Sequence, residues 1–395
     1  MAETKTRICY ILPFYEEGTD THLFYNYELI KKLAARSEDI YLIIEKSPKL
    51  SLGQIKQNLG ISNCYMQIFS FPLFRFLELL FKCFMLRLQG YANFYVHYSY
   101  YGALAAWLAT WLSGSQVRVF YWNRGMPWLF KRGWIEEKVF RFILRNTILV
   151  TGPESLAKEY IEHYGVREYR VLSNWVDVER FSPSASTSKN LLKAQALQDL
   201  AQGDGSDLPA GRQGRAIRQQ ANKDVRFVLF VHHLSKRKGA DLIPDIAKGF
   251  GDDVLFLVAG DGPEFENLKL KIENLNISNV NLLGKVSNAE IPAYFKTADI
   301  LLMPSREEGS PHVILEAMAS GVPFVASDVG GVRELVPREL EAFLCPSEDV
   351  KCFQDKIKTL LSESELYENM RAQCLEYAKK FDITRGVNEF MNLFN

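Results

Sequence analysis

Two acidic residues stand on either side of a predicted helix start in the segment EEGSPHVILEAMASG, residues 307–321. Ser310 suits the N-cap of this helix, and Pro311 suits its first position, where a missing N–H does no harm. The unpaired N–H groups and the dipole of a helix start attract an anion. Glu308 lies just before this start and Glu316 lies inside the helix, so the segment predicts an anion site flanked by two carboxylates.

The second acid shares a helix face with the residues at the helix start. Glu316 lies four residues after His312 and three after Val313, so its side chain can lean back toward the anion site. Carboxylates accept hydrogen bonds from hydroxyl groups. A ligand with phosphates for the helix start and polyols for the carboxylates would satisfy this arrangement, and a nucleotide sugar is such a ligand. From this segment alone, two surface glutamates on an ordinary helix remain an equal alternative.

Three other turns with glycine follow predicted strands. Lys238 and Gly239, in HHLSKRKGADLI, can bring a cation and bare backbone to a phosphate. AGDGPE, residues 259–264, is a glycine-rich turn, and GVPFVASDVGGVRELV supplies another at Gly330 and Gly331. Each turn could be only a tight connection. Their order along the chain predicts that they converge on one site.

The elements that must position these turns alternate between strands and helices. The predicted buried strands are RICYILPFY, DIYLIIE, VRVFYWN and TILVTG in the first part of the chain, and VRFVLFVHH, DVLFLVAGDG, VNLLG, DILLMPS and PFVASDVGG in the second. Strands and helices at this spacing predict an α/β protein with two doubly wound, Rossmann-like domains. We place these domains at residues 1–182 and 223–376, with a linker or insertion at 183–222. Ligands of such sheets bind at the carboxyl ends of the strands, here in the cleft that two domains leave.

Composition excludes several classes of protein. The 395 residues carry 47 Lys plus Arg and 47 Asp plus Glu, so no global field favours nucleic acid as a partner. Six scattered cysteines without a C-x-x-C pair indicate small buried thiols, a reducing cytoplasm and no structural zinc. The stretch 91–112 is long enough to span a bilayer. Its aromatic first half and helix-forming second half favour a buried strand followed by a buried helix.

The order of the motifs resembles that of the retaining glycosyltransferases of family 4, the "glycosyl transferases group 1" set, which has the GT-B fold. The matching motifs are KG at 238–239, GDGP at 260–263, PSREEGSPHVILEAMASGVP at 304–323, DVGGVREL at 328–335 and VLSNWVDVERFSP at 171–183. The resemblance covers nearly the whole chain. It is specific over residues 231–336 and diffuse before residue 150.

The resemblance implies a role for each matching residue. It assigns the donor diphosphate to Lys238, the donor sugar to Glu308 and the ribose hydroxyls to Glu316. The last helix, near residues 377–395, would cross back to the first domain. The other donor-binding residues that the resemblance implies are Ser310, Pro311, His312, Val313, Gly260, Val286, Gly18 and Thr19.

The sequence departs from the family pattern at two positions. His233 stands where relatives commonly have an arginine, and a partly charged imidazole holds a diphosphate less firmly. Asn123 stands where a histidine often follows an N-domain strand, and asparagine cannot exchange a proton at neutral pH. We treat Asn123, with Arg124 and His97, as candidates for the acceptor side of the site.

These residues predict a mechanism without metal or cofactor. No D-x-D element suggests a metal site, so Lys238, His233 and the helix start at Ser310 would meet the charge of the departing diphosphate. With Glu308, the lysine and His233 are the catalytic candidates. The resemblance implies transfer with retention at the anomeric carbon. We expect Lys238→Ala and Glu308→Ala to abolish most transfer with the fold intact.

The leading hypothesis is transfer of a sugar from a nucleotide-sugar donor to a lipid-linked or growing glycan acceptor, in cell-surface polysaccharide or glycolipid synthesis. A non-catalytic or weakly catalytic GT-B protein that binds sugar nucleotides is the alternative from another class. Epimerase or phosphorylase chemistry fits the acidic pair poorly. A nicotinamide dehydrogenase is disfavoured because no G-x-G-x-x-G follows the first strand.

Two segments of the first domain interleave aromatic and basic residues. They are FPLFRFLELLFKCFMLRLQG, residues 71–90, and MPWLFKRGWIEEKVFRFILRN, residues 126–146. Such surfaces suit a membrane interface with anionic lipid. The alternative is helices packed on the sheet with cations reaching out to water. The hypothesis is a cytoplasmic protein attached peripherally to the inner face of the plasma membrane.

Overall fold

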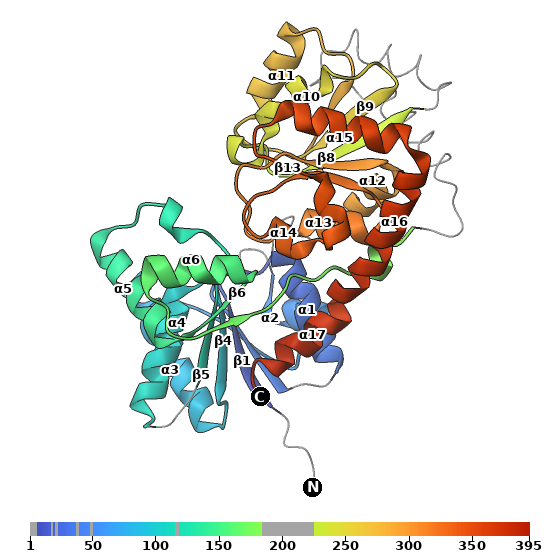
Figure 1. The fold of residues 1–395 in the computed structure, drawn as a ribbon. Coiled ribbons are helices and arrows are strands. Elements are labelled where there is room, and N and C mark those ends of the chain that lie inside the picture. Colours follow the sequence, from blue (N-terminus) through green and yellow to red (C-terminus); the bar gives the residue numbers. More distant parts are fainter. Residues whose placement is uncertain are drawn as a thin grey trace. The chain divides into compact units, whose positions relative to one another are not determined.

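The computed structural model describes residues 6–16, 19, 23–36, 39–47, 50–114, 118–183 and 225–395. Gly18 and all but the first residue of the predicted linker at 183–222 lie outside these ranges. The chain divides into two compact units, of which unit 1 comprises Met1–Asn174 with Ile383–Asn395 and unit 2 comprises Trp175–Asp382. Each unit has its own parallel sheet covered by helices (Figure 1).

The sheet of unit 1 has seven parallel strands in the order β3-β2-β1-β4-β5-β6-β7. Apolar side chains make up most of the central strands because helices cover both faces of a parallel sheet. The chain moves outward in one direction from β1 and in the other from β4, which places the topological switch point between them. The strands are β1 (Arg7–Leu12), β2 (Asp39–Ile44), β3 (Asn63–Met66), β4 (Asn93–His97), β5 (Arg118–Trp122), β6 (Ile148–Thr151) and β7 (Tyr169–Val171).

Helices cover the two faces of this sheet. Those after β3, β4, β5 and β6 share one core with Cys9, Ile11 and Val96 of the strands. On the opposite face, Phe390 near the C-terminus packs against Tyr10 and Tyr95, with 4.8 Å between the Phe390 and Tyr95 ring centroids. The helices of unit 1 are α1 (Leu23–Ala35), α2 (Leu52–Leu59), α3 (Pro72–Leu88), α4 (Tyr100–Leu112), η1 (Pro127–Leu129), α5 (Trp134–Asn146), α6 (Glu154–Tyr164) and α17 (Ile383–Asn392).

The stretch 91–112 forms the strand β4 followed by the helix α4, as predicted, and β4 is buried. The helix is buried on one side only, because Trp111 and Leu112 are exposed. Within the described ranges, none of the helices combines the length and the apolar content that crossing a bilayer demands.

The sheet of unit 2 has six parallel strands in the order β10-β9-β8-β11-β12-β13. This order repeats that of the first six strands of unit 1, with the switch point between β8 and β11. Two parallel, Rossmann-like units confirm the predicted fold class. The strands are β8 (Arg226–Val231), β9 (Val254–Ala259), β10 (Val280–Gly284), β11 (Ile300–Met303), β12 (Phe324–Ser327) and β13 (Leu344–Cys345).

The segment Trp175–Phe181 packs in unit 2. Phe181, which lies in α7, contacts Phe295 of α12 with 5.7 Å between ring centroids, and the Val176 N–H donates to the Phe381 carbonyl. The helices in the described part of unit 2 are α7 (Val178–Phe181), η2 (Lys236–Lys238), η3 (Ala240–Leu242), α10 (Ile243–Ala247), α11 (Phe265–Asn274), α12 (Ile291–Thr297), α13 (His312–Ala319), α14 (Val332–Leu335), η4 (Arg338–Phe343), α15 (Val350–Ser362), α16 (Ser364–Ala378) and η5 (Lys379–Phe381).

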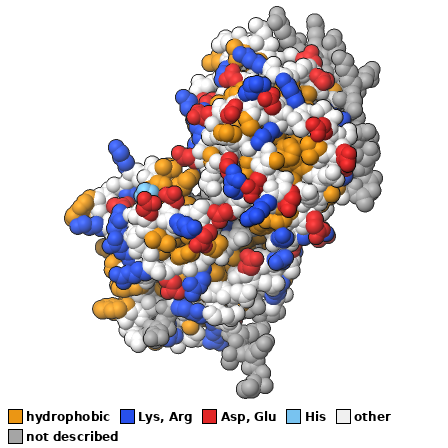
Figure 2. All heavy atoms as spheres, in the orientation of Figure 1, with side chains coloured by type: hydrophobic (Ala, Val, Ile, Leu, Met, Phe, Trp, Pro, Cys, Tyr) orange, Lys and Arg blue, Asp and Glu red, His pale blue; other side chains and the backbone are white. Residues whose placement is uncertain are grey.

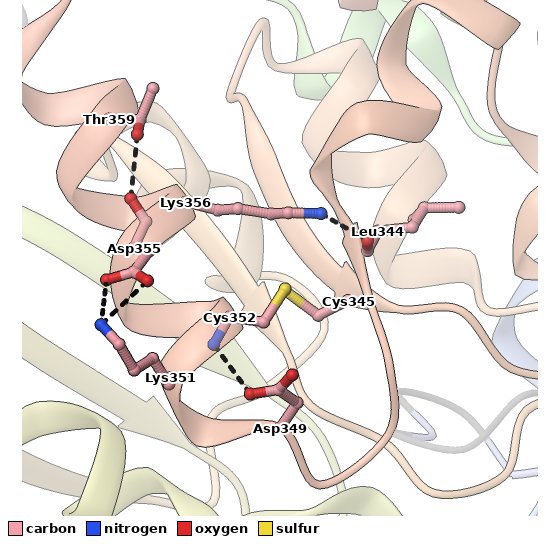
Figure 3. Close-up of a disulfide and its surroundings, with 8 residues drawn as sticks. All are labelled: Leu344, Cys345, Asp349, Lys351, Cys352, Asp355, Lys356 and Thr359. Carbon is pink, nitrogen blue, oxygen red and sulfur yellow. Dashed lines mark hydrogen bonds and ion pairs between the residues drawn. A yellow bond between two sulfur atoms is a disulfide. The ribbon is translucent and has the colours of Figure 1, made fainter.

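A disulfide corrects the expectation that all six cysteines are free thiols. Cys345, at the end of β13, is bonded to Cys352 in the first turn of α15 (Figure 3). Asp349 caps α15 by accepting from the Cys352 N–H at 3.0 Å, which brings the helix start to the strand end. The two Cα atoms are 5.8 Å apart, a distance that a disulfide requires and that sequence spacing does not reveal. The inference of a reducing cytoplasm rested in part on six free thiols, and the disulfide removes that support. The other cysteines are buried free thiols at Cys9, Cys64, Cys83 and Cys374.

Candidate functional site

The predicted donor residues of unit 2 gather at the carboxyl ends of its strands. Lys238 lies in η2, which follows β8, and Glu308 lies in the loop between β11 and α13. These two strands flank the switch point of the sheet. Open α/β sheets bind ligands in the crevice at this point, so the topology alone makes this position a candidate site.

Lys238 and Glu308 form a buried ion pair. The Lys238 Nζ lies 2.7 Å from Glu308 Oε1 and 2.8 Å from Oε2. Both side chains are buried, with 6% and 5% of each residue exposed. The Ser305 hydroxyl donates to the same Oε1 at 2.8 Å. The carboxylate is therefore held on both oxygens, as a buried charge must be.

His232, which sequence reasoning missed, completes this cluster. Its Nε2 lies 3.1 Å from Glu308 Oε1, and the backbone N–H of His233 donates to its Nδ1 at 3.2 Å. Because Nδ1 accepts, the ring proton lies on Nε2 and is donated to Glu308. Burial, followed by the charge of Lys238, lowers the pKa of His232, so the ring is neutral at pH 7.

His233 does not join the cluster, in contrast to its predicted role as a clamp. Its side chain is exposed and lies near Gly262. His232 and His233 directly follow a strand, where successive side chains point to opposite faces. Only one of the two histidines can therefore point toward Glu308, and this alternation is the signal that could have identified His232. A family position that commonly holds arginine directed the prediction to its neighbour instead.

The two charges of the pair respond differently to burial. Burial alone would raise the pKa of Glu308, but Lys238 and then His232 outweigh it and hold this pKa well below its ordinary value. Burial lowers the pKa of Lys238, and Glu308 only partly offsets this effect. The carboxylate is thus ionised at every physiological pH, and the lysine charge is already paired before any ligand binds.

Three of the predicted glycine turns lie against the residues that carry this cluster. A Cβ on Gly239 (φ +69°) would lie 2.0 Å from the Pro304 carbonyl oxygen, and one on Gly330 (φ +52°) would lie 1.8 Å from that of Glu308. A Cβ on Gly260 would lie 1.9 Å from the His232 carbonyl oxygen. Only glycine permits these approaches, so the turns set the position of the Glu308 loop and of His232.

We expect Gly330→Ala to destabilise unit 2 more than the matched variant Gly284→Ala. Both positions have positive φ, and alanine there costs about 1–2 kcal/mol. A Cβ on Gly284 (φ +67°) meets no atom within 4 Å, whereas one on Gly330 collides with the Glu308 backbone and adds about 1–3 kcal/mol. Urea unfolding of the two variants measures this difference, and equal losses would contradict the steric role of Gly330.

The helix start lies one residue later than predicted. α13 begins at His312, and Pro311 is its N-cap with extended φ and ψ of −73° and 122°. Ser310 therefore lies one position outside the cap, and no side-chain hydrogen bond caps the helix. Proline fits the N-cap because its φ is fixed near this value. The N–H groups at His312 and Val313 remain the donors of the predicted anion site.

The remaining donor-side candidates lie near the same strand ends. Glu316 is buried inside α13, one turn after His312. Gly260 follows β9 and donates its N–H to the Gly284 carbonyl at 2.8 Å. Val286, which follows β10, is partly buried against the core of unit 2. Among the described residues, no three His, Cys, Asp or Glu side chains gather as a metal site would require.

The acceptor-side candidates lie at strand ends in unit 1. His97 ends β4, is fully buried and stacks on Trp122 with 3.9 Å between ring centroids. Its Nε2 lies 3.2 Å from the Asn26 amide nitrogen, which can only donate, so this ring nitrogen accepts. Thr19 of unit 1, which the resemblance assigned to the donor side, is also buried.

Asn123 and Arg124 hold the loop after β5. The Asn123 Oδ1 accepts from the Tyr160 hydroxyl at 2.8 Å and from the Gly125 N–H at 3.0 Å, and its Nδ2 donates to the Tyr121 hydroxyl at 3.2 Å. Arg124 donates to the Leu172 carbonyl, and burial lowers its pKa to about 10. The partners of Asn123 are those of a residue that fixes a loop.

Comparisons with known proteins show which family and which fold the chain resembles. The family model described as glycosyl transferases group 1 matches residues 214–381. The N-acetyl-alpha-D-glucosaminyl L-malate synthase of Bacillus anthracis is 31% identical over 170 residues, which are 41% of this chain and 44% of that protein. The alpha-D-kanosaminyltransferase of Streptomyces kanamyceticus is 28% identical over 251 residues, 62% and 64% of the two chains. The matched segment spans about half the length of the first curated relatives.

A solved structure extends the likeness over both units. The Anabaena protein HepE, crystallised with UDP and glucose, matches 98% of this chain and 99% of its own with a TM-score of 0.75 and 17% identity. This likeness concerns the fold, and it confirms the predicted GT-B class. The predicted resemblance to the glycosyl transferases group 1 family is confirmed as well.

Proposed function

We propose that this chain, in which residues 214–381 match the glycosyl transferases group 1 model, is a retaining glycosyltransferase that uses a nucleotide-sugar donor. The observation that carries the proposal is the buried Lys238–Glu308 pair beside the start of α13, at the switch point of unit 2. The site thus combines one cation, helix N–H groups and two buried carboxylates. These are the groups that a sugar diphosphate needs.

Donor binding would rearrange the ion pair. The diphosphate of the donor attracts the Lys238 ammonium, which is now paired with Glu308. As the lysine turns to the phosphate, a Glu308 oxygen becomes available to accept from a hydroxyl of the donor sugar. His232 and Ser305 still hold the carboxylate in place during this exchange. Glu316 accepts from the ribose hydroxyls.

In the proposed transfer step, the bond between the anomeric carbon and the phosphate oxygen breaks, and the acceptor oxygen bonds to the same face of that carbon. The acceptor proton passes to the departing phosphate. Lys238 and the N–H groups at His312 and Val313 stabilise the negative charge of the nucleoside diphosphate, at about 3–4 kcal/mol for each well-placed donor. These groups allow the reaction to proceed without a divalent metal ion.

A thermal-shift screen of the full chain against UDP-, GDP- and ADP-sugars should identify the donor. One nucleotide class should raise the melting temperature, because a ligand that binds only the folded state stabilises it. The same increase is expected with EDTA as with magnesium. If no nucleotide sugar shifts the transition, the proposed donor site is wrong.

We propose a lipid-linked or growing glycan as the acceptor, bound by unit 1 in the cytoplasm. The relatives that act on sugars and the HepE structure with UDP and glucose support this class of reaction. The alternative is a protein that binds sugar nucleotides with little or no catalysis, which the exposed position of His233 favours. Release of nucleoside diphosphate from the donor identified above separates the two, because a pure binding protein releases none.

A further inference from the structure

Helix α3 is apolar on the side that faces solvent as well as on the side that faces the sheet. Its buried residues Leu79, Cys83 and Leu86 pack in the core of unit 1. A surface helix of a globular domain normally presents polar residues on its outer side. The outer side of α3 instead carries residues at spacings of three and four, each 36–66% exposed: Phe74, Leu77, Phe81, Met85 and Leu88.

This apolar surface continues onto α4 and α5. The helices α3, α4 and α5 cover the same face of the sheet, so their outer sides all point away from it. Trp107 of α4 contacts Phe142 of α5 with 4.9 Å between ring centroids, which joins the two outer sides. In Figure 2, hydrophobic side chains at the outer left edge of the molecule are interleaved with Lys and Arg. The other exposed apolar residues of this surface are Ile68, Phe69, Phe71, Leu73, Trp111, Leu112, Trp134 and Ile135.

The basic residues of the surface are concentrated on α5. Within unit 1, Lys82 of α3 lies over the Tyr65 ring, with its Nζ 4.7 Å from the centroid, and Arg75 pairs with Glu45 at 3.3 Å. These two cations of segment 71–90 therefore contact protein. This corrects the expectation that they belong to a surface for anionic lipid. A hollow of about 310 Å³ at α5 is lined by Lys138, Arg141, Arg145, Arg167, Phe142 and Asn146.

Two of the three guanidinium groups in this hollow, which we call the α5 hollow, are held by backbone carbonyls. Arg145 donates its Nε–H to the Tyr164 carbonyl at 2.9 Å, and Arg141 donates to the His163 carbonyl at 2.8 Å. Glu137 pairs with Arg141 at 3.0 Å, and among the described residues no carboxylate lines the hollow beside its four cations. The α5 hollow thus has an excess of positive charge that a phosphate group can neutralise.

We propose that the outer face of α3, α4 and α5 binds a bilayer that contains anionic phospholipid, with a head-group phosphate in the α5 hollow. Trp111, Trp134 and the exposed apolar residues on the outer side of α3 would enter the interfacial region, where aromatic and apolar side chains are favoured. A second copy of the chain is a worse occupant. A two-fold contact through this face would bring two clusters of four cations together. The inference deepens the proposed function, because a lipid-linked acceptor lies in such a membrane.

The test is co-sedimentation of the full chain with vesicles of phosphatidylcholine alone and of an equal mixture with phosphatidylglycerol. We expect binding to the mixed vesicles and weakening as salt rises from about 0.05 M to about 0.5 M. Arg145→Gln combined with Arg167→Gln should weaken binding about ten- to thirty-fold, since each basic residue near an anionic surface contributes about fivefold. Phe81→Ser combined with Leu88→Ser should also weaken binding, by about thirtyfold or more.

Matched controls lie on exposed helices of unit 2. Lys351→Gln with Lys358→Gln on α15 removes two cations, and Leu270→Ser on α11 removes an exposed apolar side chain. Neither should change vesicle binding. Equal binding by all variants, or no binding to the mixed vesicles, would overturn the proposal. Self-association that Phe81→Ser with Leu88→Ser abolishes would do the same, because it would make this face a dimer contact.

Inorganic phosphate at millimolar concentration should compete only weakly with the vesicles, and full competition would indicate a site for a free anion instead. Because the assay contains neither donor nor acceptor, its result is independent of the nucleotide-sugar screen. A chain that binds UDP-sugar but no vesicle would keep the proposed function and lose only this surface.

Discussion

Lys238→Met is expected to remove most sugar transfer and to lower the free energy of unfolding of unit 2 by about 3–5 kcal/mol. The loss of transfer follows from the loss of the cation that meets the diphosphate. The loss of stability follows from Glu308, whose buried carboxylate would keep only His232 and Ser305 as partners. The buried pair thus changes the expectation that the fold would be unaffected. Urea unfolding and release of nucleoside diphosphate measure the two effects.

The double variant Lys238→Met with Glu308→Gln separates these effects. It leaves no unpaired charge in the site, so most of the lost stability should return. Transfer should not return, because the cation that meets the diphosphate and the carboxylate that contacts the donor sugar are both absent. A double variant as unstable as Lys238→Met would show that the cost lies in packing rather than in the unpaired charge.

The stability deficit of Lys238→Met should depend on pH. In the wild type, Lys238 and His232 depress the Glu308 pKa, so Glu308 stabilises the fold above the pKa of an unfolded glutamate. This contribution is lost as pH falls through the lower, folded-state pKa. In the variant, Lys238 no longer outweighs burial, so the Glu308 pKa rises and the Glu308–His232 pair takes up a proton as pH falls from neutral to acid. The deficit should therefore shrink over this range, and a constant deficit would contradict the electrostatic account.

Much of the fold follows from the sequence because buried parallel strands leave a strong local signal. The strand at Val254–Ala259 ends in a glycine turn, and Ile300–Met303 is apolar throughout, so both could be placed from their residues. The start of α13 was predicted one residue early. Ser310 has the stronger intrinsic preference for an N-cap, but the helix begins after Pro311. The exact residue at which a helix starts depends on tertiary packing, which the local preferences of the residues do not encode.

Single residues of the site could be predicted where they stand in one motif. Contacts between residues of two distant segments could not. Glu308 and Lys238 each stand in a recognisable turn, yet their contact with each other depends on the neighbouring positions of β8 and β11. His232 was missed because the family pattern pointed to its neighbour His233, and its contact with Glu308, 76 residues away in the chain, follows only from the fold. The pairing of Cys345 with Cys352 escaped for a related reason, since only the folded backbone brings these two residues within bonding distance.

Glu308→Gln and Glu316→Gln should have opposite kinetic signatures, although both remove one buried carboxylate of the same helix region. In the proposed mechanism Glu308 contacts the donor sugar, so Glu308→Gln should lower kcat by about 10²–10³-fold. Glu316 holds the ribose hydroxyls in donor and transition state alike. Glu316→Gln should therefore raise KM by about tenfold or more with little change in kcat.

Binding of the nucleoside diphosphate alone gives a second, independent contrast. This ligand has no sugar for Glu308 to contact, and in Glu308→Gln the Lys238 ammonium is no longer paired with a carboxylate. The affinity of the Glu308→Gln variant for the nucleoside diphosphate should therefore stay the same or increase. Glu316→Gln should bind the same ligand more weakly, because it loses the contact with the ribose. Calorimetry with the nucleoside diphosphate from the donor screen measures both. Equal weakening in the two variants would show that Glu308 holds the nucleotide itself, and the division of roles between the two acids would be wrong.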